Sequence, residues 1–121
     1  MLPFIHTPDP SAEYETPERC LILKIWDDDR DCSVSVARAT VKPGVTTQPH
    51  RLQGVDERYI VMLGTGMVTV GEMAPEKVGP GAVVIIPAGT AQQISNTGDT
   101  DLVFYCICTP RFSPESYESL E

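Results

Sequence analysis

Short apolar segments alternate with polar turns along most of this chain. Several segments place apolar and polar side chains alternately, a period of two that is typical of β-strands. Glycine, proline and acidic residues separate the segments at short intervals, which favours many short strands over a few long helices. Gly64-Thr65-Gly66 lies between two of the segments and is expected to form a hairpin turn. The predicted strands span residues 20–26, 33–41, 46–52, 57–63, 67–71, 82–86, 92–95 and 102–109.

The two ends of the chain differ from this strand-rich middle. Residues 1–18 carry four prolines among polar residues, which predicts an extended arm because proline lacks a backbone N–H. In the tail over 110–121, Ser113 precedes Pro114 and Glu115, an order that favours the start of a helix. We therefore expect a short helix over 114–119. No linker or repeat divides the chain, so residues 1–121 are expected to form one all-β domain, a barrel or a sandwich.

The balance of charge narrows the classes of partner. The 121 residues carry a formal net charge of −8, and an acidic surface repels nucleic-acid phosphates and anionic lipids. No stretch approaches the ~20 consecutive apolar residues of a membrane-spanning helix, and the first residues do not form a secretory signal. We expect no nucleic-acid or membrane partner and a cytoplasmic location.

The chain has four cysteines, whose spacing fits neither a zinc ribbon nor a CxxC redox motif. Cys106 and Cys108 are two residues apart in an apolar segment, so in a strand they share one face. Free cysteine is among the most buried residue types. We expect Cys20, Cys32, Cys106 and Cys108 to be buried, reduced thiols.

Two stretches have a specific spacing of glycine, proline and polar residues. The first reads Gly44-x5-His50-x-Leu52-x4-Glu57-x6-Gly64. The second reads Gly81-x5-Pro87-x-Gly89-x2-Gln92-x3-Asn96. The pair resembles the two motifs of the cupin superfamily, G-x5-H-x-H-x(3,4)-E-x6-G and G-x5-P-x-G-x2-H-x3-N, at eight of ten fixed positions. The resemblance implies a small single-domain cupin, a double-stranded β-helix (jelly-roll) barrel.

Two departures from the cupin pattern bear on a metal site. Cupin metal sites use two histidines and a glutamate from the first motif and a histidine from the second, but this chain has Leu52 and Gln92 at two of those places. The resemblance therefore leaves His50, Glu57 and Gln92 as metal ligands. An imidazole and a carboxylate suit Zn, Fe, Ni or Mn, whereas an amide oxygen is a weak ligand for them. A divalent transition metal is a possible cofactor on this interpretation, and a metal-free site is the alternative.

Strand parity extends the list of side chains that face the same way. If His50 points into the barrel, Gln48 and Leu52 do too, and if Glu57 points inward, so does Tyr59. His50 and Glu57 are the candidate acid–base residues, and each could instead be a buried or solvated structural residue. The candidate substrate-binding residues are Gln48, Leu52, Tyr59 and Gln92. The last strand, residues 102–109, is apolar on both faces, so its inward face is left open.

Three functions remain open, all acting on a small organic molecule. The first is a metal-dependent enzyme, for which the resemblance suggests a dioxygenase, isomerase, cyclase or lyase. The second is a metal-free binding protein, a sensor or a storage partner. The third is a metal-free isomerase or cyclase that uses His50 and Glu57 for acid–base chemistry.

The apolar strands also bear on assembly. Three segments are apolar on both faces, 20–26, 82–86 and 102–109. The core of a small barrel can cover only one face of each strand, so the other face needs a different cover. We expect a homodimer that packs sheet against sheet, an arrangement the cupin resemblance also implies.

Overall fold

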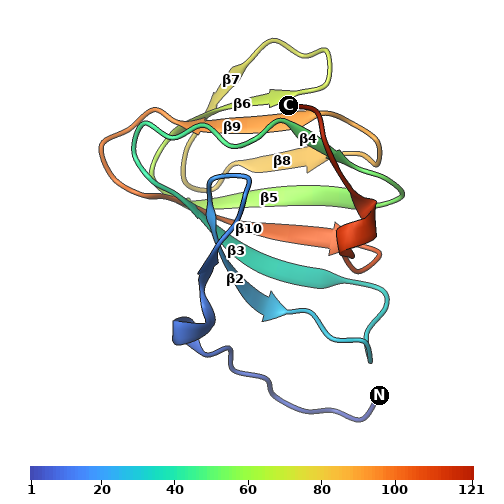
Figure 1. Ribbon diagram of the computed structural model, residues 1–121. Coiled ribbons are helices and arrows are strands. Elements are labelled where there is room, and N and C mark those ends of the chain that lie inside the picture. Colours follow the sequence, from blue (N-terminus) through green and yellow to red (C-terminus); the bar gives the residue numbers. More distant parts are fainter.

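The computed structural model describes all 121 residues as two facing antiparallel β-sheets with almost no helix (Figure 1). One sheet has six strands in the order β1-β2-β3-β10-β5-β8, and the other has five in the order β11-β4-β9-β6-β7. This architecture confirms the all-β barrel. The strands are β1 (Tyr14–Glu15), β2 (Leu21–Trp26), β3 (Ser35–Val41), β4 (His50–Leu52), β5 (Asp56–Leu63), β6 (Gly66–Val70), β7 (Glu76–Val78), β8 (Val83–Ile86), β9 (Gln92–Asn96), β10 (Leu102–Thr109) and β11 (Tyr117–Ser119).

Alternation along the strands places the core between the two sheets. In β5, Glu57, Tyr59 and Val61 are buried while the residues between them are not, as the period of two predicts. The core is mainly aliphatic, with Val41 and Leu102 fully buried and Ile94 only 1% exposed. Burial of such side chains is the main favourable term in folding.

The turn at Gly64 differs from the predicted hairpin. β5 belongs to the six-stranded sheet and β6 to the five-stranded sheet, so the chain crosses from one sheet to the other at Gly64–Gly66. Gly64 has a φ of +80°, and a Cβ there would lie 2.5 Å from the Asp101 carbonyl oxygen. Glycine is needed at this corner because a side chain would meet the backbone of Asp101 and Leu102.

The tail also differs from its prediction. The expected helix over 114–119 is only a single 3₁₀ turn, Pro114–Ser116, with Pro114 in its first turn and no side-chain bond from Ser113. Tyr117–Ser119 then leaves the turn as β11, which pairs with β4. Strand pairing with β4 satisfies the backbone of these residues in place of helical bonds.

The arm is more structured than a fully extended segment. It contains a 3₁₀ turn, Pro10–Ala12, and the short strand β1, which pairs with β2. β1, residues 16–20 and β2 form a hairpin (Figure 1). Its turn is hydrogen-bonded to Thr46 and Gln48, in the segment before β4. This hairpin is the part of the arm that matters for the site.

The outer face of the six-stranded sheet carries exposed apolar side chains at one edge. Val83 and Ile85 in β8 are 57% and 60% exposed, while Val84 and Ile86 are buried. A second copy could cover this face, and the homodimer stays a prediction. None of the helical segments has the length and apolar character that crossing a bilayer requires.

Candidate functional site

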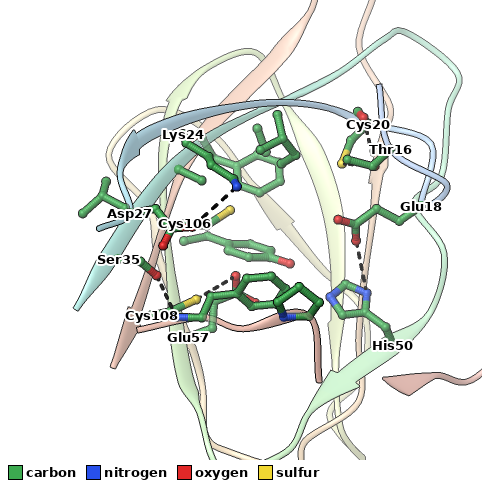
Figure 2. A pocket seen from close by; sticks show the side chains of 18 of the residues that line it. Thr16, Glu18, Cys20, Lys24, Asp27, Ser35, His50, Glu57, Cys106 and Cys108 are labelled. Carbon is green, nitrogen blue, oxygen red and sulfur yellow. Dashed lines mark hydrogen bonds and ion pairs between the residues drawn. The ribbon is translucent and has the colours of Figure 1, made fainter. Parts of the chain in front are cut away.

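A cavity of about 390 Å³ lies inside the barrel, and its lining includes the candidate residues His50, Glu57 and Tyr59 (Figure 2). Glu18 and His50 face it from one side, and Asp27 and Ser35 face it from the other. Aromatic and thiol side chains fill the space between them, among them Tyr59, Phe104, Cys106, Cys108 and Phe112. The volume falls in the range of small-molecule sites, roughly 300–1,000 Å³.

The inward face of β10 is the one that carries Phe104, Cys106 and Cys108, since all three line the cavity. All four cysteines are free. Cys20 and Cys108 are buried and Cys106 is half-buried, but Cys32 is exposed, which corrects its expected burial. Burial raises the pKa of the Cys20 thiol to about 12 and raises the pKa of Cys106 and Cys108 as well. The thiols that face the cavity are therefore protonated and are poor nucleophiles.

His50 is held in one orientation at the start of β4. Its Nδ1 lies 2.9 Å from the Gln48 carbonyl oxygen, which can only accept, so Nδ1 carries a proton and donates it. The ring stacks on Tyr117 with centroids 4.8 Å apart. In a neutral imidazole the other nitrogen, Nε2, then has a free lone pair, and it faces the cavity in Figure 2.

Glu57 sits in a buried hydrogen-bond network. The Gln92 side-chain amide donates to Glu57 Oε1 at 2.8 Å, and the Tyr59 hydroxyl donates to Gln92 Oε1. The Cys108 thiol donates to Glu57 Oε2 at 3.6 Å. Burial raises the pKa of Glu57, against the opposing effects of the Gln92 bond and of charge on His50. A carboxyl group in this environment keeps its proton to a higher pH than an exposed one.

We expect the raised pKa of Glu57 to make stability depend on pH. Above the ordinary pKa of 4.5, the unfolded chain releases the Glu57 proton while the folded chain keeps it. The folded state then binds more protons, so the free energy of unfolding falls as pH rises from 4.5 through the raised pKa of the folded state. The loss is about 1.4 kcal/mol for each unit by which that pKa is raised.

Urea unfolding of wild type and Glu57→Gln at several pH values from 4.5 to 8 measures this effect. The variant keeps an oxygen for the Gln92 amide but has no proton to release, so the two stabilities diverge as pH rises, with wild type losing more. Parallel stability profiles would show that Glu57 is ionised in the folded protein.

The other predicted site residues are distributed unevenly around the cavity. Tyr59 lines it, whereas Gln92 is 2% exposed and lies behind Glu57 and Tyr59 rather than on the cavity surface. Leu52 packs in a small separate cluster with Val55 and Cys108. Gln48 lies outside the cavity lining, where its side chain accepts a bond from the Tyr117 hydroxyl at 2.5 Å.

Glu18 is a cavity residue that the sequence pattern does not reveal. It comes from the hairpin between β1 and β2, and its Oε2 lies 3.6 Å from His50 Nδ1. Its side chain is 21% exposed, and burial raises its pKa while the nearby His50 acts to lower it. The only sequence signal is Pro17 and two charged residues before an apolar strand, which marks a turn but not which charge faces inward.

The far side of the cavity is a small ionic cluster that the sequence pattern also leaves hidden. Arg111 Nε lies 2.6 Å from Asp27 Oδ1, and Lys24 Nζ lies 4.0 Å from Asp27 Oδ2. The Phe112 amide donates to the Ser35 hydroxyl at 2.9 Å, which fixes the tail against β3. The cavity therefore offers polar groups at both ends of an apolar middle.

The three donors named for a metal do not fit a transition-metal site. The Gln92 oxygen accepts from Tyr59, and both Glu57 oxygens accept from neighbouring side chains. Gln92 is 2% exposed and does not line the cavity, so only His50 and Glu57 of the three reach the cavity surface. No three His, Cys, Asp or Glu side chains converge with the geometry of a metal site. The site offers one imidazole and one carboxyl group where stable transition-metal binding needs three or four ligands.

Facing antiparallel sheets around a polar-ended cavity define a double-stranded β-helix barrel. Residues 37–108, more than half of the chain, match the family model described as the cupin domain. The chain belongs to the cupin family, which confirms the resemblance.

The chain is also similar to curated proteins and to solved structures. The uncharacterized protein MJ1618 of Methanocaldococcus jannaschii is 33% identical over 72% of this chain and 69% of its own length. The oxalate-binding protein of Thermotoga maritima is 35% identical over 59% of this chain and 58% of its own length. The Streptomyces nucleoside dehydratase Pac13 superposes with a TM-score of 0.79 over 98% of this chain and 92% of its own. Its sequence identity is only 13%, so this likeness concerns the fold alone.

Proposed function

We propose that the protein binds a small organic molecule in the barrel cavity and transfers protons on it without a metal ion. The observation that carries this proposal is the orientation of His50. Because Nδ1 donates to the Gln48 carbonyl, a neutral ring presents its Nε2 lone pair to the cavity, which is the arrangement a general base needs.

Glu57 supplies the complementary acid in this proposal. Burial raises its pKa, so the group keeps its proton to a higher pH than an exposed carboxyl group and can donate it to a ligand oxygen. Gln92 and Tyr59 fix the carboxyl group from behind through their bonded chain. A positioned base and a protonated acid in one apolar cavity suit an isomerase, cyclase or lyase that moves a proton next to a carbonyl group.

Solvent deuterium exchange tests the proposal without knowledge of the substrate. Protein treated with a chelator is incubated in D₂O with 2-oxo acids, ketoses and uronic acids, and loss of each C–H signal is followed by ¹H NMR. We expect faster exchange at the carbon beside the carbonyl for at least one compound. A compound that raises the melting temperature but exchanges no faster than in buffer contradicts the catalytic part.

A binding protein without catalysis is the second candidate. The name of the Thermotoga maritima relative, an oxalate-binding protein, favours it. Oxalate has no C–H bond, so it serves as a pure binding probe. Stabilisation by oxalate alone, with no exchange in any carbonyl compound, supports this second function over the first.

A further inference from the structure

The hairpin between β1 and β2 spans the two sheets at the Glu18 side of the cavity. Its turn is closed by the Thr16 amide bonded to the Cys20 carbonyl at 2.9 Å and by the Arg19 amide bonded to the Thr16 carbonyl at 3.1 Å. Arg19 is the one residue other than glycine with a positive φ, +71°. The hairpin therefore has a tight turn, residues 16–20, here called the tip, that is closed by its own backbone bonds.

Polar contacts hold the tip to the opposite sheet. The Arg19 guanidinium lies against Glu121 with two bonds of 3.0 and 2.7 Å, and its Nε donates to the Thr46 carbonyl at 2.9 Å. The Gln48 amide donates to the Glu18 carbonyl at 3.0 Å. The Arg19 and Glu121 side chains are 44% and 48% exposed, so water competes for the pair.

Apolar burial contributes little to this attachment. No residue from Glu13 to Arg19 is buried, and the first buried residue is Cys20, where β2 begins to join the core. Segments held by few apolar contacts and exposed bonds open at low free energy. Exposed ion pairs add little to that free energy.

The tip also forms part of the site. Tyr14, Thr16, Glu18 and Cys20 all line the cavity, and Figure 2 shows Glu18 reaching from the hairpin toward His50. Movement of the hairpin away from Thr46 and Gln48 would therefore widen the cavity and separate Glu18 from His50 in a single step.

We propose that residues 13–19 of the β1–β2 hairpin form a lid on the barrel cavity, while β2 stays paired with β3. The ion pair between Arg19 and Glu121 latches the lid, and closure of the lid brings Glu18 to His50. The closed lid places the Glu18 carboxyl group beside the protonated Nδ1, where it helps to orient the ring. The role of Glu18 toward His50 as a base rests on the proposed function, whereas the opening of the lid does not.

Hydrogen exchange at one amide measures the opening of the lid. The backbone amide of Gln48 donates to the Glu18 carbonyl in the lid, while the backbone amide of Thr47 donates to the Ile94 carbonyl in β9. In Arg19→Gln and Glu121→Gln we expect exchange at Gln48 to rise roughly fivefold, the effect of losing an exposed multidentate pair. Exchange at Thr47 stays unchanged.

Lys42→Gln is the matched control, since it removes an exposed ion pair with Asp101 on another part of the surface. It leaves exchange at Gln48 at the wild-type rate. Unchanged exchange at Gln48 in both latch variants overturns the proposal.

Alkylation of the cavity thiols tests whether the moving hairpin is a lid. Iodoacetamide reacts with thiolates, so the buried, protonated Cys106 and Cys108 are labelled only when the cavity opens to water. Their labelling is followed by peptide mass spectrometry, with the exposed Cys32 as an internal standard. Both latch variants should label the cavity thiols severalfold faster and Cys32 at the wild-type rate. Faster exchange at Gln48 without faster labelling shows a mobile hairpin that does not gate the cavity, and overturns the lid. Neither readout depends on proton transfer at His50.

Discussion

We expect His50→Gln to slow the proposed proton transfer in the cavity, with a loss of roughly 10²–10⁴-fold in the deuterium-exchange rate. Glutamine has a side-chain N–H that can bond the Gln48 carbonyl, so this carbonyl retains a side-chain partner. It has no basic nitrogen in place of Nε2. The rate should therefore fall while ligand-induced stabilisation remains.

The second histidine provides the control for this loss. His6 lies in the arm, where its ring is 5.5 Å from that of Trp26, and it does not line the cavity. His6→Gln should exchange the same compound at the wild-type rate. An equal rate in His50→Gln would remove His50 from the chemistry.

Gly64→Ala lowers the free energy of unfolding by about 3 kcal/mol, because it combines a positive φ with a steric clash. The added Cβ would stand 2.5 Å from the Asp101 carbonyl oxygen and 3.0 Å from the Leu102 Cα. Both contacts are backbone atoms at the start of the core strand β10, so neither can move cheaply.

Gly54→Ala separates the two causes. Gly54 has a similar φ of +72°, but a Cβ there meets nothing within 4 Å. Its cost is the conformational part alone, about 1 kcal/mol. Urea unfolding of both variants measures the difference, and equal losses would show that the corner at Gly64 relaxes to admit a methyl group.

Much of the barrel is predictable from local patterns. The segment 102–109 is apolar without interruption and coincides with β10, Leu102–Thr109. Alternation in β5 is enough to place Glu57 and Tyr59 on the same face of the strand. Short strands with weak patterns, such as β7, are missed because two of their three residues are charged.

The order of apolar and polar residues within a segment does not predict which sheet a strand joins. A glycine pair between two strands looks the same whether the chain folds back or crosses to the other sheet, so the pattern at Gly64 predicts a hairpin where the chain turns a corner. The tail is predicted as a helix because Pro114 favours a helical start, while pairing of Tyr117 with Leu52 in β4 is a long-range effect.

The site shows the same division between local and long-range information. Motif spacing identifies His50 and Glu57, which both line the cavity. Glu18 and Arg111 arrive from the ends of the chain, and only tertiary contacts bring them there. Gln92 retains its place in the motif but serves Glu57 and Tyr59 instead of the cavity surface.

Elemental analysis of freshly purified wild type and His50→Ala determines whether the proposed proton transfer takes place in a barrel without a bound metal ion. We expect far less than one transition metal per chain in both proteins, and no rise in melting temperature when Zn²⁺ or Mn²⁺ is added. Close to one metal per wild-type chain, lost in His50→Ala, would overturn the metal-free proposal and restore His50 and Glu57 as metal ligands.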